Sequence, residues 1–510
     1  MYGSVWSLVP FLIVIPVAIW TRQVLPGLLA GLLVGAYMLH PSLLGGVDAT
    51  LNYILKELAV PDNLRLVVFL YGFGAFVGLV RVTGGVSGFA HWMSERVQSA
   101  KGAFAVTWLS SAATFMAPDF RIITVAPVMK EVFSRLRISP ERVAFIIDVT
   151  STPLCALVPI GTAFVGYMVG LISTSARHHE LAGSAFHVFL LSLPLNFFAL
   201  LMLAYGLYTT FAPSRKQEVS TRAVSNRHAS AMSTETRLRL TSQLAQMEAS
   251  TELSPTPTQA SKKAPKEDEY VDPVEVLSEH VPPKLSNLAV PIVLLLTLTL
   301  FFTWWSGHQH ATGFWQAMAV ADSARAMLQA LLVTLLASLI WYAVQRQPIQ
   351  RTLFGVIAGG NEMMNVIVLL GLVWAVSAVS NDLGFTEFTE RTIGHLVPPA
   401  LIAPVLFAFG CVLSYVIGSS FGTWGMLLPL GFSLAAGTGA SVPLIAGAVF
   451  ASGTFGGFAS PLSDGTVAMA TVMKLPVMNY ARYKLKPALY VAGASTVLYA
   501  LAGWFLPRLA

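Results

Sequence analysis

Apolar stretches of about 17 to 25 residues recur along the whole 510-residue chain. Each is long enough to cross the roughly 30 Å hydrocarbon core of a bilayer as a helix. Hydrophobic residues make up 55% of the chain and charged residues only 11%, whereas a soluble domain usually carries about 25% charged residues. One soluble core cannot bury this much apolar sequence, because cores stop growing near roughly 300 residues. The sequence therefore predicts an all-α, multi-pass membrane protein.

The N-terminal stretch and the rarer residue types fit that class. The first apolar run has no basic region before it and no small-residue cleavage site, so we expect a retained span rather than a signal peptide. Cys155 and Cys411 lie in apolar segments and are expected to be packing residues rather than a disulfide or metal pair. The net charge of +6 suits the basic cytoplasmic rim of a membrane protein and requires no nucleic-acid partner.

A single polar segment divides the chain. Residues 213–286 are rich in Ser, Thr and Pro, a composition that predicts a disordered linker. We expect residues 1–212 to form a first transmembrane repeat and residues 287–510 a second. An offset of 302 residues places Pro127 on Pro429 and Pro159 on Pro461. An offset shared by well-separated landmarks is the signature of an internal repeat.

Each half is predicted to hold five spans and one re-entrant hairpin, which gives ten spans and two hairpins. The hairpins occupy 103–134 and 399–437, with polar tips at 117–121 and 418–422, and the broken spans occupy 143–175 and 442–476. This arrangement collects most basic loop residues on one side, which the positive-inside rule makes cytoplasmic. The two repeats are then inverted, the linker is cytoplasmic and both termini lie outside a plasma (inner) membrane.

The second hairpin tip, GSSFGTWGMLLP from position 418, also fits the nucleophile pattern G-x-S-x-G. A serine nucleophile needs a general base within hydrogen-bond reach, and the histidines are expected in loops, at span ends or in the linker. An intramembrane serine hydrolase is therefore only a remote alternative, and we expect a protein that is not an enzyme.

We expect the interrupted helices to form an ion site near the middle of the membrane, since irregular backbone survives there only when buried or lining a cavity. Freed carbonyl groups at such breaks coordinate cations. Carboxylate and hydroxyl oxygens at the second-half breaks would add ligands. The second-half candidates are Ser420, Thr423, Ser460, Ser463 and Asp464, of which Ser460, Ser463 and Asp464 are proposed Na⁺ ligands.

The first half supplies charged residues that are costly inside a bilayer and so need a reason. Asp119 and Arg121 lie at the first hairpin tip, where they form either an ion pair or a receptor for a substrate carboxylate. Thr150 and Thr152 in the first broken span are expected to shape the same site. Asp148 starts that span, where capping, gating and ion ligation are all open.

One further polar cluster falls in an apolar span. In the segment GGNEMMN, Asn361 and Asn365 are four residues apart and share one helix face. They and Glu362 either line the transport pathway or form hydrogen bonds between helices.

Several of these stretches carry a family resemblance. The first-half run FRIITVAPVMKEVFSRLRISPERVAFIIDVTSTPLCALVPIGT, together with GSSFGTWGMLLPL and SGTFGGFASPLSDGTVAMATVM, is similar to NhaC-type Na⁺/H⁺ antiporters. The resemblance covers most of residues 79–177 and 415–495. It implies a secondary transporter of the ion-transporter superfamily, with inverted repeats, a homodimeric assembly, and Na⁺ and/or H⁺ as coupling ions without other cofactors.

The first hairpin departs from the family pattern. The family's hairpin usually reads F-D-D-Y-F-N, and here Phe115 is followed by MAPDFR, so that Arg121 replaces the usual amide. Two functions follow from the resemblance. The first is Na⁺/H⁺ antiport by alternating access. The alternative is Na⁺- or H⁺-coupled transport of a small carboxylate or amino acid that Arg121 receives.

Overall fold

The computed structural model describes residues 4–96, 99–136, 138–178, 184–211, 281–308, 313, 317, 321–388 and 398–505. Within these residues all regular structure is helical. A helix satisfies its own backbone hydrogen bonds, which is what an apolar solvent demands. The predicted linker at 213–286 falls almost entirely outside the described residues, and the described chain resumes at Val281.

The described part of the first half contains fifteen helical elements. The first fourteen are η1 (Val5–Leu8), α1 (Val9–Thr21), α2 (Val24–Leu39), α3 (Leu43–Leu58), α4 (Pro61–Val82), α5 (Gly85–Arg96), α6 (Ala100–Leu109), α7 (Ser111–Thr114), α8 (Pro118–Arg135), α9 (Pro140–Val149), α10 (Thr152–Cys155), α11 (Ala163–His178), α12 (Ala185–Ser192) and η2 (Leu193–Leu195). The fifteenth, α13 (Phe197–Phe211), closes this half. Proline occupies the first turn of several of these helices, where its missing N–H costs nothing.

The second half consists of fewer and longer helices. They are α17 (Ser286–Gly307), α19 (Ser323–Val344), α20 (Ile349–Glu362), α21 (Met364–Asp382), α22 (Phe385–Phe388), α24 (Pro399–Ile417), α25 (Ser420–Thr438), α26 (Val442–Ala459), α27 (Asp464–Met473) and α28 (Val477–Phe505). Serine caps set two of the starts that matter here. The side chain of Ser419 accepts from the N–H of Gly422, and that of Ser463 accepts from the N–H of Thr466.

The structure supports a multi-pass membrane protein but not the expected count of ten spans. Seven helices of the described chain are long and apolar enough to cross a membrane, or eight if the pair from Ala185 to Phe211, bent by 44°, is one span. The helices at 9–21 and 24–39 are apolar but shorter than a full span.

Two helical segments were not expected as separate elements. Helix α3 contains Asp48, Asn52 and Lys56, so its sequence resembles a polar loop, yet it exposes Leu44 and Leu55 on one face. Helix α20 is the other, and α20 and α21 together form one apolar run from Ile349 to Asp382. Amphipathic order of this kind is invisible to a search for uniformly apolar stretches.

The two halves interlock rather than forming separate bodies. One compact unit contains residues 1–210 together with 274–510. Helix α8 of the first half packs on α27 of the second, α11 packs on α25, and α4 packs along α20. Where α4 crosses α20, a Cβ on Gly78 would lie 2.1 Å from the carbonyl oxygen of Gly355. Only glycine permits that approach, as at small-residue crossings in membranes generally.

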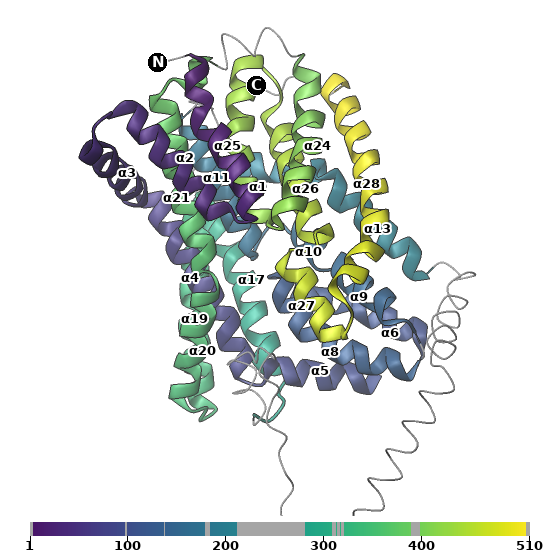
Figure 1. The fold of residues 1–510 in the computed structure, drawn as a ribbon. Coiled ribbons are helices and arrows are strands. Elements are labelled where there is room, and N and C mark those ends of the chain that lie inside the picture. The colour runs from purple at the N-terminus through teal and green to yellow at the C-terminus, as the bar shows by residue number, and fades with distance from the viewer. Residues whose placement is uncertain are drawn as a thin grey trace, which may run out of the picture. The chain divides into compact units, whose positions relative to one another are not determined.

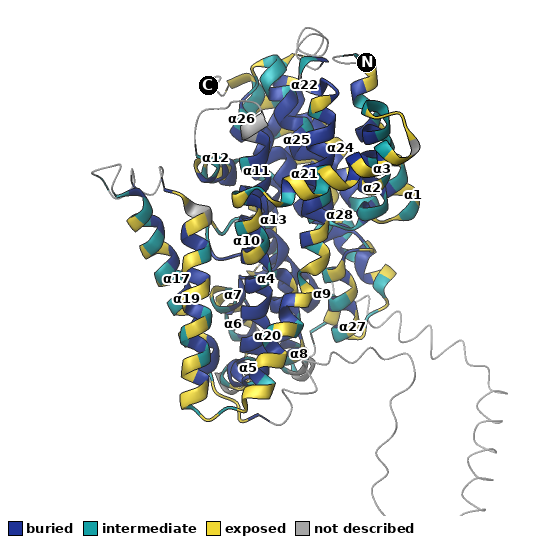
Figure 2. Ribbon diagram, turned by 90° about the vertical axis from the view of Figure 1, so that its left-hand side faces the viewer, coloured by how far each residue is buried: buried dark blue, intermediate teal, exposed yellow. Residues whose placement is uncertain are grey.

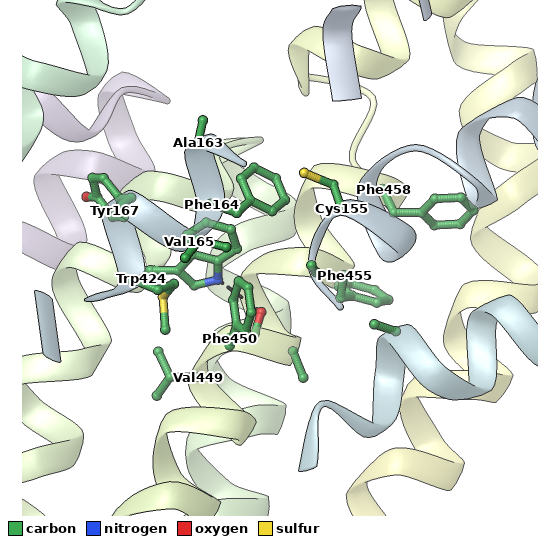
Figure 3. Packing of buried hydrophobic residues seen from close by; sticks show 14 of the residues in the cluster. Cys155, Ala163, Phe164, Val165, Tyr167, Trp424, Val449, Phe450, Phe455 and Phe458 are labelled. Atoms are coloured by element: carbon green, nitrogen blue, oxygen red, sulfur yellow. Dashed lines mark hydrogen bonds between the residues drawn. The ribbon is translucent and has the colours of Figure 1, made fainter. Parts of the chain in front are cut away.

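The most buried helices are those at the contact between the two halves. Figure 2 shows α25, α26 and α11 as the most buried helices, while α17 and α19 present exposed outer faces. At the centre, Trp424 of α25 donates its indole N–H to the carbonyl of Phe450 in α26 at 3.0 Å (Figure 3). Phe164 of α11 packs edge-on against the same indole, with ring centroids 4.8 Å apart. This aromatic cluster joins residues of the first half to residues of the second (Figure 3).

Candidate functional site

The candidate site lies where four helices begin or end inside the unit. Helix α8 starts at Pro118, α25 at Ser420 and α27 at Asp464, while α9 ends at Val149. The break before α25 is a left-handed glycine, Gly418, with φ of 78°. Because helices start at these points, orphan N–H groups and free carbonyl groups gather there.

The positions of the breaks differ in part from those expected. Asp119 and Arg121 lie in the first turn of α8 rather than in a non-helical tip at 117–121, because Pro118 starts the helix there. Ser420 and Thr423 likewise lie in the first turn of α25. Within the broken span predicted over 442–476, α26 stays helical to Ala459 and only residues 460–463 interrupt the helix.

Two carboxylates, one from each half, meet at these breaks. Asp119 is the second residue of α8 and Asp464 the first of α27, two helices that pack together. Both side chains are exposed. The Asp119 carboxylate interacts electrostatically with that of Asp464, and its Oδ1 lies 3.8 Å from where a Cβ on Gly465 would stand. Helix N-termini favour negative charge, which helps to hold two like charges close together.

The surrounding oxygen atoms are hydroxyl and carbonyl groups. Ser460 donates to the carbonyl of Tyr415 at 2.7 Å, Ser420 donates to the carbonyl of Gly453 at 2.9 Å, and Thr423 donates to the carbonyl of Ser419 at 2.9 Å. Ser463 caps α27. Such oxygens suit a hard cation such as Na⁺ better than a transition metal. Among the described residues, no group of three or more His, Cys, Asp or Glu side chains is arranged to hold a metal ion.

The Ser420 contact also bears on the hydrolase alternative. The hydroxyl of Ser420 donates its proton to a backbone carbonyl of α26, so it is engaged as a structural donor. A nucleophilic serine instead gives its proton to a general base. The match of GSSFG to the nucleophile pattern is therefore explained by a helix start and its cap.

Arg121 is fully buried, and its partners are oxygens without formal charge. Its guanidinium donates to the hydroxyls of Ser110, Thr114 and Thr150 and to the carbonyl of Thr107, with N···O distances between 2.7 and 3.2 Å. Five contacts engage the five donors that a guanidinium has. In this conformation no donor is left for a substrate carboxylate.

Asp119 and Arg121 therefore do not pair across the first turn of α8. The described contacts of Arg121 include no carboxylate. Thr150 lies at the C-terminal end of α9 and receives two of the guanidinium contacts. Thr152 starts α10, is buried, and its methyl group lies 3.4 Å from where a Cβ on Gly457 would stand. The two threonines thus serve different contacts, one inside the first half and one toward the second.

A third feature was missed at the level of sequence. Lys484 of α28 forms an ion pair with Asp148 of α9 at 2.6 Å, and the two side chains are 0% and 3% exposed. Tyr480 donates its hydroxyl to the same Oδ2 of Asp148 at 2.6 Å. Lys484 also donates to Thr466 at 2.7 Å, and Thr466 donates to the carbonyl of Ser460 at 2.7 Å. This network, named here the α9–α28 network, ties the first half to the break before α27.

The sequence held one signal for this network. Tyr480 and Lys484 are four residues apart and so share a helix face. The side chain of Lys484 is buried, because α28 begins at Val477 and turns this side chain inward. Asp148 is correspondingly an ion-pair partner near the end of α9 rather than a residue at the start of a span.

The Asn361–Asn365 cluster lies at a helix junction. Glu362 forms an ion pair with Arg81 of α4 at 2.7 Å. Met363 separates α20 from α21, so Asn361 and Asn365 are on different helices instead of one continuous face. Both asparagines are exposed, and the carboxylate of Glu362 interacts electrostatically with that of Asp119.

The chain is similar to several bacterial proteins, two of which are named as antiporters. An uncharacterised protein of Haemophilus influenzae is 23% identical over 100% of this chain and 92% of its own length. The Na⁺/H⁺ antiporter NhaC of Bacillus subtilis is 23% identical over 34% of this chain and 37% of its own. The malate-2H⁺/Na⁺-lactate antiporter of the same organism is 26% identical over 22% of this chain and 24% of its own.

The fold has a solved counterpart. The Alcanivorax borkumensis YdaH transporter, whose structure is described as having an unusual topology, superposes with a TM-score of 0.54 at 13% identity, over 91% of this chain and 90% of that one. At that identity the likeness concerns the fold alone. The model of the Na⁺/H⁺ antiporter family matches residues 161–504, which run from just before α11 to the last turn of α28. The chain therefore belongs to the Na⁺/H⁺ antiporter family and is a secondary transporter.

Proposed function

We propose that this protein exchanges Na⁺ for H⁺ across the plasma (inner) membrane by alternating access. The observation that carries the proposal is the meeting of Asp119 and Asp464, one carboxylate from each half, at the starts of two packed helices. Two like charges held close together at packed helix starts favour a bound cation or a shared proton. Competition between those two occupants is what couples the two ion flows.

The coordination of Na⁺ would come from oxygens around Asp464. Its carboxylate, the hydroxyls of Ser460 and Ser463, and carbonyls of the α26–α27 break are the candidate ligands, with Ser420 and Thr423 of α25 beside them. At present these hydroxyls bond to carbonyl oxygens. A cation would replace the hydroxyl protons as the partner of those carbonyls.

Alternating access requires two units that rock against one another, and an inverted repeat supplies them. Three observations support a repeat. Gly84 and Gly384 both follow an apolar span and both have a left-handed backbone, with φ of 77° and 79°. Pro127 and Pro429 lie inside α8 and α25. The cross-packing is reciprocal, since α8 meets α27 and α25 meets α11.

A second function is favoured by a relative. The malate-2H⁺/Na⁺-lactate antiporter is named for carboxylate substrates as well as for both ions. Transport of a small carboxylate or amino acid is therefore the alternative for this chain. It requires Arg121 to exchange at least one of its oxygen partners for substrate, because all five donors are engaged in the conformation described.

The test uses purified protein in proteoliposomes with a pH-sensitive dye inside. An inward Na⁺ gradient is expected to drive protons out of the vesicles with the wild type. Neutralising either carboxylate, Asp119→Asn or Asp464→Asn, is expected to lower the rate at least tenfold, because one charge of the shared site is lost. Asp48→Asn, which changes an exposed acid on α3, is the matched control and is expected to behave as the wild type.

Two results would contradict the proposal. Proton movement that is equal in Asp464→Asn and in the wild type would remove Asp464 from the site. A wild type that moves no protons under Na⁺, yet accumulates labelled malate, lactate or arginine, would replace cation exchange by the alternative function.

A further inference from the structure

The α9–α28 network is the one buried ion pair in the described chain that joins the two halves near the candidate site. Lys484 and Asp148 are separated by 336 residues and lie 2.6 Å apart. Burying such a pair is costly, and replacing it with apolar residues often stabilises a protein. A pair of this kind at helix breaks is therefore a candidate for function rather than for stability alone.

The pair is connected to the cation site on two sides. Asp148 interacts electrostatically with Asp119. Lys484 donates to Thr466 at 2.7 Å, and the Thr466 hydroxyl lies 2.6 Å from that of Ser463. Ser463 immediately precedes Asp464, whose side chain is exposed. A continuous row of hydroxyl groups thus runs from the buried ammonium to the edge of the site.

We propose that Lys484 carries one proton of the exchange: its ammonium loses that proton when a cation binds beside Asp119 and Asp464, and regains it when the cation leaves. The inference rests on the proposed function. In the step itself the Thr466 hydroxyl turns from the carbonyl of Ser460 toward Ser463, 2.6 Å away. An N–H bond of Lys484 Nζ then breaks, and Thr466 accepts that proton while passing its own to Ser463. Ser463 in turn releases a proton to water beside Asp464, so neither hydroxyl is consumed.

Charge balance is the physical reason for the step. A cation that binds to the carboxylates adds one positive charge to a region of low dielectric, where excess charge is expensive. Loss of one proton from Lys484 removes the same charge. After the transfer Thr466 donates to the lone pair of the neutral amine, while Tyr480 and an amine N–H keep their hydrogen bonds to Asp148.

Other charged groups on the packed elements must be considered in reading any pH dependence. Around Asp148 and Lys484 they are Tyr480 and Tyr483 on α28, Asp464 on α27, Asp119, Arg121 and Lys130 on α8, and Arg142 on α9 itself. Of these, Lys130 donates to the carbonyl of Val472 and Arg142 to the carbonyl of Thr209. Lys130 and Arg142 therefore bond to backbone carbonyls instead of to the ion pair. Substituting Lys484 alone then shows how many of the released protons come from Lys484.

The experiment counts protons directly on purified protein. Na⁺ is titrated calorimetrically at one pH in buffers with different ionisation enthalpies, which gives the protons released for each Na⁺ bound. Lys484→Gln is expected to release one proton fewer than the wild type. Lys486→Gln, an exposed lysine on the same helix, is the matched control and is expected to release the wild-type number.

A double variant separates a proton carrier from a structural contact. Asp148→Asn with Lys484→Gln keeps polar partners at both positions without an unpaired charge. The proposal expects this variant to fold, to bind Na⁺ and still to release one proton fewer. Restoration of the wild-type number in the double variant would show that the pair only holds the helices together.

The two levels of failure are distinct. A wild type that binds no Na⁺ refutes the proposed cation exchange, and the role of Lys484 with it. A wild type that binds Na⁺ and releases the same number of protons as Lys484→Gln refutes the role of Lys484 and leaves the proposed function standing.

Discussion

At the scale of single residues, Arg121 shows how a charge survives in a buried site without a counter-ion. An unpaired ion is costly in a low-dielectric interior. Three hydroxyl groups and one carbonyl replace the water that the guanidinium loses. The same contacts hold α6, α7, α8 and α9 together, so we assign Arg121 a structural role in the conformation described.

That role predicts a loss of stability on substitution. Arg121→Met preserves much of the volume but leaves the hydroxyls of Ser110 and Thr114 and the carbonyl of Thr107 without their partner. We expect the free energy of unfolding to fall by roughly 3 kcal/mol, since each buried group left unpaired costs about 1–3 kcal/mol.

The measurement is thermal unfolding in detergent. Arg65→Met is the control, because Arg65 pairs with Asp62 at a partly exposed position where an ion pair contributes about 1 kcal/mol or less. An Arg121→Met protein as stable as that control, with altered selectivity for carboxylates, would instead make Arg121 a substrate receptor.

At the scale of elements, the breaks and crossings of helices position the site. Proline and glycine marked the breaks in the sequence, and the structure places them at Pro118, Gly418 and residues 460–463. What the sequence missed is where each helix resumes. A helix that restarts one or two residues earlier moves its acidic residue from a loop into a first turn, and thereby next to a helix N-terminus.

The α4–α20 crossing yields a prediction at this scale. Gly78→Ala would place a Cβ 2.1 Å from the carbonyl oxygen of Gly355, and the two helices must separate to accept it. We expect a loss of about 1–3 kcal/mol in stability, as for other overpacked contacts.

Gly493→Ala on α28 is the matched control for that crossing. No atom lies within 4 Å of a Cβ at Gly493, so this change is expected to preserve or slightly raise stability through higher helix propensity. Equal unfolding temperatures for the two variants would mean that the crossing is looser than the structure indicates.

At the scale of the whole molecule, the two halves form one interlocked unit that we propose to be an inverted repeat. In such a repeat the loop after α2, which begins at His40, would correspond to the loop after α19, which is followed by Gln350 in the first turn of α20. Figure 1 shows α3, which follows the first loop, in the upper part of the view and the turn between α19 and α20 at the bottom. Inversion would put these loops on opposite faces of the membrane.

Cysteine labelling tests that arrangement and the assignment of the cytoplasmic side. His40→Cys is expected to react with a membrane-impermeant maleimide in intact cells, and Gln350→Cys only after permeabilisation. Both positions are exposed, and the native Cys155 and Cys411 are buried, so background labelling is low. Labelling of both positions from the same side would contradict the inverted repeat, and with it the outside placement of the termini and the cytoplasmic linker.

The homodimer and the linker stay predictions at this scale. The homodimer is supported by the resemblance to NhaC-type antiporters. Residues 212–280 lie outside the described structure. Exposed apolar side chains on the outer faces of α1, α3 and α28, such as Trp20, Leu44 and Phe505, suit contact with lipid tails.

The sequence by itself determined the class of protein, the interrupted helices and the family. Those properties follow from local features, because hydropathy over twenty residues, a proline or a glycine acts within its own stretch of chain. The tertiary structure alone decided which side chains, distant in the sequence, contact one another. Asp148 meets Lys484 across 336 residues, and Arg121 fills its donors with four different residues. Which distant side chains meet depends on how helices pack, and no local pattern encodes that packing.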